Sequence, residues 1–218
     1  MVTDSSTSNG LTKFVVEMGG KLLRYKKGYR YVIELGRETK NCVLAMEASG
    51  HGGFAKHNFI DDGMYTAIRV LIELHSLRIK NNNNNLSISD IIIDFNEACE
   101  SSELRLNMLM GNSFENREKA TMLSLQCLKN VVMKIPFWEE EPINYEGLRV
   151  MIKNEPNGIT GWLMLRASLH EPIISLQFES EVKGGSKDIL NLLLQNGFDE
   201  LEKLNILDLS NIRKFINQ

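Results

Sequence analysis

The segment Glu47-Ala48-Ser49-Gly50-His51 places three polar side chains within five residues of one another. A carboxylate accepts hydrogen bonds and a hydroxyl both donates and accepts them, so Glu47 and Ser49 together suit the neighbouring hydroxyls of a polyol. His51 adds a third hydrogen-bonding side chain to the same segment. A flexible glycine turn with incidental polar residues explains the segment equally well when it is considered alone.

A second polar segment, Arg166-Ala167-Ser168-Leu169-His170-Glu171-Pro172, lies far along the chain between two predicted strands. Alternate side chains share a face in an extended chain, so Arg166, Ser168 and His170 could point together at one ligand. A guanidinium, a hydroxyl and an imidazole suit a phosphate. The alternative is an ordinary hairpin with its arginine in solvent.

Basic and aromatic residues alternate around Gly28, where Lys27 and Arg30 flank the predicted start of a helix. Free backbone N–H groups and the helix dipole favour an anion at such a position. Lys27 and Arg30 are therefore possible anion contacts, and a solvated surface turn is the alternative.

The elements that would position these residues follow from hydrophobic periodicity. An apolar run over residues 42–46 predicts a buried strand, and residues 64–79 predict a helix whose buried stripe is Met64, Ile68, Leu71 and Leu74. Strands and helices alternate from the first residue, which predicts a three-layer α/β/α domain with a mostly parallel sheet. Met1-Val2-Thr3 resembles the end of a strand, so we expect this domain to be incomplete at its N-terminus.

The patterning changes after residue 135, where all four prolines lie. We predict an α/β/α domain over residues 1–80, a connecting segment over 81–135, and a small α+β domain over 136–218. The connecting segment would hold a helix over 87–96, a strand over 103–108 and a helix over 115–133, and its boundary could lie anywhere between Arg78 and Met110. In the last domain, strands over 147–152, 162–167 and 173–179 precede a helix over 187–195 that Ser186 caps.

Composition excludes several classes of protein. Of the 218 residues, 43% are hydrophobic and 24% charged, and the net charge of -3 gives no bulk attraction to nucleic acid or to an acidic membrane surface. No run approaches the roughly 20 apolar residues that cross a bilayer. Three widely spaced cysteines favour an intracellular, reducing compartment such as cytoplasm or plastid, any targeting segment being missing from the chain, and the four histidines lack metal-ligand spacing.

Together the motifs resemble the α-D-phosphohexomutase family, in its phosphoglucomutase and phosphomannomutase branch. The resemblance rests on Glu-x-Ser-Gly-His, on Asp-Gly about ten residues later, and on Leu-Arg-x-Ser-x-x-Glu-Pro roughly a hundred residues further on. Residues 8–12 and 26–32 also look like segments of the family's third domain. The resemblance implies that the first motif is the sugar-binding loop of domain 3 and the second is the phosphate-binding loop of domain 4.

By this resemblance Glu47 and Ser49 would bind sugar hydroxyls, which lets a hexose bind in two flipped orientations, and His51 would orient the substrate or help proton transfer. Arg166, Ser168 and His170 would hold the phosphate that is not reacting. The last loop departs from the family's Ser-Gly-Thr-Glu-Pro, because Leu169 and His170 stand where glycine and threonine are usual. An imidazole in place of a hydroxyl changes how the phosphate would be held.

The family's phosphoserine loop, Ser-His-Asn-Pro, and its magnesium loop, Asp-x-Asp-x-Asp-Arg, do not occur in this sequence. We therefore expect the C-terminal part of an enzyme that interconverts hexose 1-phosphate and hexose 6-phosphate. The full-length enzyme would need Mg²⁺ and a hexose 1,6-bisphosphate, and this chain alone would bind no metal and be inactive. Its partners would be a phosphorylated hexose and the N-terminal catalytic domains. The alternative is a non-catalytic phosphosugar-binding or regulatory module.

Overall fold

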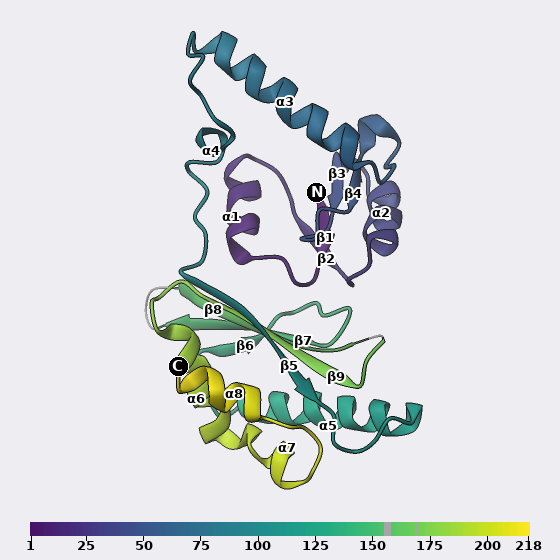
Figure 1. Ribbon diagram of the computed structural model, residues 1–218, viewed down its shortest axis with the longest axis vertical. Helices are drawn as coiled ribbons and strands as arrows, with labels where there is room; N and C mark the ends of the chain where they lie inside the picture. The colour runs from purple at the N-terminus through teal and green to yellow at the C-terminus, as the bar shows by residue number, and fades with distance from the viewer. Residues whose placement is uncertain (155–157, 169) are drawn as a thin grey trace. The chain divides into compact units, whose positions relative to one another are not determined.

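A computed structural model describes residues 1–154, 158–168 and 170–218 of the chain. The chain forms two compact units, Met1–Glu97 and Ala98–Gln218, hereafter unit 1 and unit 2 (Figure 1). Each unit has its own sheet and its own hydrophobic core. Among the described helices, none is both long enough and apolar enough to cross a membrane.

Unit 1 is built on a four-stranded sheet in the order β2-β1-β3-β4. The strands are β1 (Val2–Asp4), β2 (Leu23–Tyr25), β3 (Leu44–Met46) and β4 (Gly52–Phe54). β1 is parallel to both β2 and β3, and β4 is antiparallel to β3. This confirms the predicted α/β class.

Two helices connect the parallel strands, α1 (Asn9–Glu17) and α2 (Tyr29–Glu38). The chain moves from β1 outwards to β2 and then back across β1 to β3. Since both crossovers are right-handed by rule, the two helices must lie on opposite faces of the sheet. Figure 1 shows α1 and α2 on the two sides of these strands.

The core of unit 1 lies between the sheet and α2. Val32 and Ile33 from the helix pack with Val2 and Ala45 from the strands. Cys42 and Phe59 complete the same cluster. The short loops at the ends of β3 and β4 are therefore anchored to a small apolar layer.

The long helix α3 (Gly63–Lys80) differs from its predicted packing. Leu74 is buried, but Met64, Ile68 and Leu71 are 72%, 47% and 58% exposed, so the predicted buried stripe is wrong at these three positions. The first turn touches β4 through the rings of Tyr65 and Phe54, and further along α3 packs against the short helix α4. An apolar stripe becomes buried only where another element covers it, and most of this one has no cover within the unit.

The helix predicted over residues 87–96 is also shorter than expected, because α4 spans only Ile88–Ile91. Three consecutive β-branched residues, Ile91 to Ile93, lose rotamer freedom in a helix and favour an extended chain. Beyond them the chain runs past α1, where Phe95 meets Phe14 edge to face with 5.6 Å between ring centroids.

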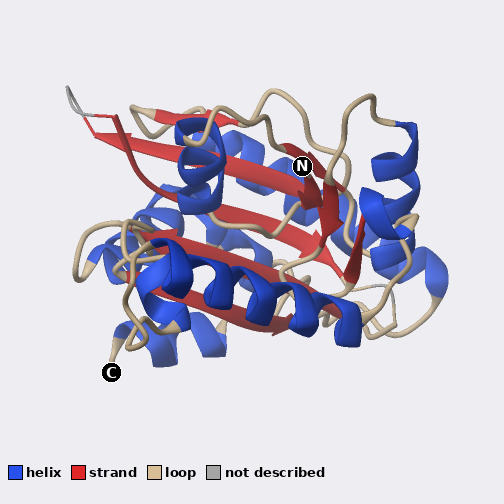
Figure 2. Cartoon of the chain, turned by 90° about the horizontal axis from the view of Figure 1, so that it is seen from above, coloured by secondary structure: helices blue, strands red, loops and turns tan. Residues whose placement is uncertain are grey.

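Unit 2 is a five-stranded antiparallel sheet in the order β5-β9-β8-β7-β6. Its strands are β5 (Glu100–Asn107), β6 (Trp138–Glu140), β7 (Leu148–Asn154), β8 (Gly158–Ala167) and β9 (Ile173–Ser180). Its helices are α5 (Phe114–Val132), α6 (Gly185–Leu193), α7 (Glu200–Lys203) and α8 (Ser210–Ile216), with a π-helical turn over Leu194–Phe198. Figure 1 shows the helices gathered on one side of the sheet, and Figure 2 shows the chain from above, with helices in blue and strands in red.

The two units divide the predicted connecting segment, 81–135. β5 pairs with β9 from Glu100↔Ser180 to Asn107↔Ile173, and α5 contributes Ala120 and Leu128 to the core of unit 2. Residues from Ala98 onwards therefore belong to the second unit. The partner of β5 lies about 70 residues along the chain, and no local pattern reveals such a pairing.

Helix α6 begins earlier than predicted and is capped from a distance. Its N-cap is Gly184, which has no side chain to accept a hydrogen bond from the first turn of the helix. The carboxylate of Glu100 on β5 takes the cap's place, accepting hydrogen bonds from the backbone N–H of Gly184 (2.6 Å) and of Ser186 (2.9 Å). These hydrogen bonds lower the pKa of Glu100, because they stabilise its charged form.

Candidate functional site

The loop that follows β3 is organised by the side chain of Glu47, which is only 8% exposed. One carboxylate oxygen, Oε1, accepts a hydrogen bond from the backbone N–H of Gly28 at 2.6 Å. The other, Oε2, accepts one from the hydroxyl of Ser49 at 3.1 Å. The structure therefore brings together Glu47 and Ser49, and each carboxylate oxygen retains a second lone pair for a ligand hydroxyl.

Gly28 precedes α2 in a backbone conformation that only glycine adopts easily, with φ at 126°. A Cβ atom at this position would lie 2.8 Å from the ring of Tyr31. Because Glu47 already bonds the N–H of Gly28, the protein supplies its own anion at this helix start. Arg30 is exposed and donates to the hydroxyl of Tyr29 at 3.3 Å, and anion binding by Lys27 and Arg30 stays a prediction.

His51 is held by Asp61, ten residues further along the chain. Asp61 Oδ2 lies 2.9 Å from His51 Nδ1, and Oδ1 accepts a hydrogen bond from the N–H of Gly52 at 2.9 Å. A carboxylate only accepts, so His51 carries its proton on Nδ1 in this pair and keeps Nε2 for another partner. The ring of Tyr29 lies beside His51, with 5.4 Å between centroids.

The neighbouring Asp62 has a different task, since it caps α3. It accepts a hydrogen bond from the N–H of Tyr65 at 2.9 Å, and His57 Nε2 lies 3.2 Å from its second oxygen. The hydrogen bond from Tyr65, followed by the contacts with His57, lowers the pKa of Asp62. The carboxylates of Asp61 and Asp62 thus bond different groups and do not form a magnesium site. Within the ranges that the structure describes, no cluster of three or more His, Cys, Asp or Glu could hold a metal.

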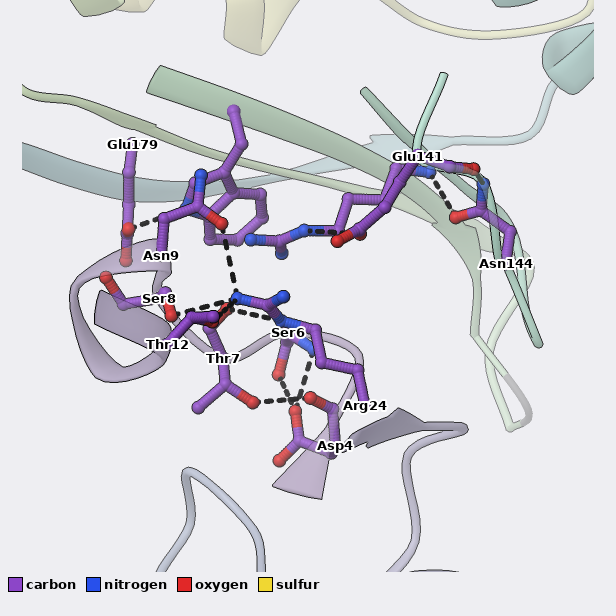
Figure 3. Close-up of polar contacts among 12 residues, drawn as sticks. Asp4, Ser6, Thr7, Ser8, Asn9, Thr12, Arg24, Glu141, Asn144 and Glu179 are labelled. Carbon is purple, nitrogen blue, oxygen red and sulfur yellow. Dashed lines mark hydrogen bonds and ion pairs between the residues drawn. The ribbon is translucent and has the colours of Figure 1, made fainter. Parts of the chain in front are cut away.

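A further anchor of the loop comes from Asp4, the last residue of β1, which is drawn in Figure 3 with the segment that follows it. Asp4 Oδ2 accepts a hydrogen bond from the N–H of Ala48 at 2.8 Å. Arg24 on β2 orders the same segment by donating to the carbonyls of Thr7 and Ser8 and to the side chains of Asn9 and Thr12, at 2.7 to 3.3 Å. Sequence reasoning missed both residues, because their partners lie up to 44 positions away.

In unit 2, the loop between β8 and β9 is organised by Ser168. Its hydroxyl oxygen accepts hydrogen bonds from the N–H groups of His170 (3.3 Å) and Glu171 (3.2 Å). Two donors fill the lone pairs of that oxygen, so its own proton is available to an acceptor such as a phosphate oxygen.

Arg166, at the end of β8, is largely buried, with its side chain 15% exposed. It donates to the carbonyl of Ala167 at 3.3 Å, and its Nε lies 3.9 Å from Glu146 Oε1. That distance is too long for a hydrogen bond. Nε is buried and makes no hydrogen bond to the described residues, which suits a guanidinium that binds an anion.

The chain turns at Ser168, so the argument that alternate residues share a face holds only as far as Ala167. The hydrogen bond from the N–H of Ser168 to the carbonyl of Ile173, at 3.0 Å, closes the turn. His170 is exposed just beyond it. Leu169 lies outside the described residues. Phosphate binding by Arg166, Ser168 and His170 stays a prediction.

A buried arginine on β7 also escaped the sequence reasoning. Arg149 is 1% exposed, pairs with Glu141 at 3.0 Å, and lies over the ring of Trp162 with 3.6 Å to the centroid. Its backbone N–H donates to Asn144, and Figure 3 shows Asn144 and Glu141. These contacts fix the segment between β6 and β7, which also carries Glu146.

Comparison with known proteins shows similarity to one group of enzymes. Residues 1–95 match the family model described as phosphoglucomutase/phosphomannomutase, alpha/beta/alpha domain III. A phosphoglucomutase of Neisseria gonorrhoeae is 24% identical over 193 residues, which are 88% of this chain and 36% of the relative. A phosphomannomutase/phosphoglucomutase of Pseudomonas syringae pv. tomato is 26% identical over 84% of this chain and 34% of its own length. The chain thus spans about a third of the length of these relatives.

Two solved structures have a similar fold. A phosphoglucomutase/phosphomannomutase family protein of Burkholderia thailandensis covers 94% of this chain with a TM-score of 0.68 and 23% identity, over 38% of its own chain. The open form of parafusin, a phosphoglucomutase of Paramecium, covers 92% with a TM-score of 0.60 and 14% identity, again over 38% of its chain. At such identities the likeness shows the fold alone.

Proposed function

Because the chain belongs to the phosphoglucomutase/phosphomannomutase family, we propose that it serves an enzyme that interconverts hexose 1-phosphate and hexose 6-phosphate. In this proposal the chain supplies sugar recognition through Glu47, Ser49 and His51. It supplies phosphate binding through Arg166, Ser168 and His170.

The observation that carries the proposal is the arrangement of Glu47 within the region that matches the family. Gly28 and Ser49 orient its two carboxylate oxygens at 2.6 and 3.1 Å. A carboxylate that is held in place and can still accept hydrogen bonds, together with the hydroxyl beside it, can bind two neighbouring sugar hydroxyls. This pair of groups recognises the sugar in either orientation, because it contacts hydroxyls and not the reacting phosphate.

Transfer of a phosphoryl group needs a nucleophile, a cation and positioning groups. In our proposal the described residues supply positioning groups, and His51 exchanges a proton with a substrate hydroxyl through Nε2. The serine carrier, Mg²⁺ and the hexose bisphosphate belong to the rest of the enzyme, and the isolated chain is inactive. We also propose a reducing compartment, since three widely spaced cysteines favour reduced thiols.

Calorimetric titration of the 218-residue chain with glucose 6-phosphate tests the binding role. We expect glucose 6-phosphate to bind more tightly than glucose or inorganic phosphate alone. Arg166→Ala and Glu47→Gln should each weaken binding about tenfold, the effect of losing one charge-assisted hydrogen bond. The exposed Arg105 and Glu34 provide matched controls, since Arg105→Ala and Glu34→Gln should leave affinity unchanged. Equal affinity in all four variants would contradict the proposal.

A mutase assay with glucose 1-phosphate, Mg²⁺ and glucose 1,6-bisphosphate tests inactivity, and turnover by this chain would refute it. A non-catalytic phosphosugar-binding or regulatory module is the other candidate, because neither Ser-His-Asn-Pro nor Asp-x-Asp-x-Asp-Arg occurs in this sequence. Sequencing the DNA upstream of Met1 separates the two. In-frame Ser-His-Asn-Pro and Asp-x-Asp-x-Asp-Arg motifs favour the enzyme, and their absence favours the module.

A further inference from the structure

We propose that Arg117, on α5, is a positioning residue for the phosphate loop, defined as residues 166–168 and 170–172. Its guanidinium nitrogen Nη2 donates to the carbonyl oxygen of Glu171 at 3.0 Å and to that of Ser168 at 3.3 Å. One side chain thus holds two backbone carbonyls that lie three residues apart. The inference rests on the proposed function, because it assigns a task within the same phosphate site.

The position of Arg117 on α5 is itself fixed. The helix is capped by Ser113, which accepts from the N–H of Asn116, and Asn116 donates to the carbonyl of Met110 at 2.8 Å. Ala120, Ser124 and Leu128 follow Arg117 at spacings of three and four residues and are fully buried. Arg117 therefore continues the inward stripe of the helix by one turn and reaches the loop from the unit's own core.

The loop does not need Arg117 in order to form a hairpin. The N–H of Ser168 bonds the carbonyl of Ile173 at 3.0 Å, and the N–H of Met108 bonds the carbonyl of Pro172 at 2.9 Å. Arg117 adds a fixed orientation for two peptide carbonyls, those of Ser168 and Glu171. A guanidinium that faces two carbonyl oxygens draws their negative ends towards α5, which reduces their repulsion of a bound phosphate.

Ser168 connects this contact to ligand binding. Its carbonyl is held by Arg117, and its hydroxyl oxygen is held by the N–H groups of His170 and Glu171. With both groups fixed, the hydroxyl proton has a defined direction before a ligand arrives. Prior ordering of this kind raises affinity, because binding then orders fewer groups.

Arg105 offers a matched comparison. It also contacts Glu171, but through the side-chain carboxylate at 3.2 Å, and both side chains are more than half exposed. Exposed ion pairs of this kind contribute little, whereas Arg117 contacts backbone groups of the loop. A comparison of variants at the two arginines thus separates the effect of positioning the loop backbone from the effect of positive charge near residue 171.

The test compares R117Q, R117K and R105Q in titrations with glucose 6-phosphate and with inorganic phosphate. We expect R117Q to weaken glucose 6-phosphate binding about tenfold and R105Q by less than about twofold. R117K should fall between them, because a lysine retains the charge but not the planar fork. The melting temperature without ligand should stay close to that of the unaltered protein, since the backbone hydrogen bonds of Ser168 and Met108 close the hairpin without Arg117.

Amide hydrogen exchange at His170 and Glu171 gives a second measurement that needs no ligand. It should accelerate in R117Q and remain unchanged in R105Q. Equal affinity of R117Q and the unaltered protein would overturn the inference, as would equal losses in R117Q and R105Q. If R117Q melts at a clearly lower temperature, R117K decides: full affinity in a stable R117K overturns the inference.

The two proposals fail in different ways. If the unaltered protein binds neither ligand, the proposed function fails, and the exchange rates at His170 and Glu171 still decide the role of Arg117. If the unaltered protein binds glucose 6-phosphate and R117Q binds it equally well, the proposed function survives and the positioning role fails.

Discussion

The core of unit 2 draws on all five of its strands and on α5, α6 and α8, whereas the core of unit 1 is the six-residue cluster around α2. Their candidate loops are held in correspondingly different ways. In unit 1, three carboxylates bond backbone N–H groups: Asp4 to Ala48, Glu47 to Gly28, and Asp61 to Gly52. In unit 2, the loop joins two long paired strands, and its neck is closed by backbone hydrogen bonds.

The difference shows what each loop depends on. A loop held by carboxylates keeps its shape as long as those groups are charged and the thin core beneath them stays ordered. The position of a loop that joins two central strands is set by the pairing of those strands, which a large core holds in place. We therefore expect damage to the two cores to be separable.

The largest effect is expected from Phe178→Ala in unit 2. Phe178 on β9 is fully buried and meets Phe215 edge to face at 5.5 Å between centroids. Removing such a ring typically costs about 3–5 kcal/mol in the free energy of unfolding. Hydrogen exchange with mass spectrometry should show faster exchange throughout β5 to β9 and unchanged exchange in β1 to β4. Phe114→Ala, at a residue 76% exposed, is the control and should change neither unit. Equal loss of protection in both units would contradict separable cores.

Gly53→Ala is the corresponding change in unit 1 and should have the next largest effect. A Cβ atom on Gly53 would lie 2.6 Å from the backbone carbon of Phe59 and 2.7 Å from its Cα. Backbone atoms cannot move aside cheaply, and overpacking of this kind costs about 1–3 kcal/mol. We expect faster exchange in β3 and β4 only. Gly63→Ala, where nothing lies within 4 Å of the added atom, is the matched control. Faster exchange in β7 and β8 would show that the units share stability.

Local patterns predicted the elements of this fold well. The apolar run before Glu47 predicted β3, and strand-rich patterning predicted β8 and β9 on either side of the second motif. These predictions succeeded because the hydrophobic periodicity of a strand or helix can be recognised from residues that are close in sequence. The stripe of α3 was misjudged for a related reason: periodicity shows that a helix face is apolar, but it does not show whether another element covers that face.

The contacts that shape the two loops could not be predicted in the same way. Asp61 holds His51, which lies ten positions before it. Arg117 holds a carbonyl 51 positions along the chain, and Glu100 caps a helix 84 positions away. Such contacts depend on how distant elements pack. The one signal for Arg117 is its place at the end of the stripe formed by Ala120, Ser124 and Leu128.

Glu100→Gln should produce a smaller, pH-dependent effect confined to unit 2. The N–H groups of Gly184 and Ser186 hold the pKa of Glu100 below the ordinary value of 4.5. A lowered folded pKa stabilises the protein above the unfolded pKa, and this contribution is lost as the pH falls through the lower folded value. At neutral pH the variant should lose about 1 kcal/mol, the usual worth of a helix cap. Once the pH has fallen below the lowered folded pKa, the variant and the unaltered protein should converge, because both are then uncharged at this position. Denaturant titrations at several pH values measure this, and a constant difference down to low pH would contradict the cap.

Leu71→Ser should have the smallest effect and addresses the exposed helix of unit 1. Leu71 is 58% exposed on α3, so its replacement should change the free energy of unfolding by less than about 0.5 kcal/mol.

Leu74→Ser, one turn along the same helix at a residue 8% exposed, should cost about 2 kcal/mol or more, because it removes a buried side chain and introduces a hydroxyl. Thermal unfolding of unit 1, followed by exchange in β1 to β4, distinguishes the two variants. Light scattering should also show less self-association for Leu71→Ser, since it breaks an exposed apolar stripe. If Leu71→Ser were as damaging as Leu74→Ser, a further copy or segment must cover α3 in solution, and the thin core of unit 1 would be larger than the chain alone provides.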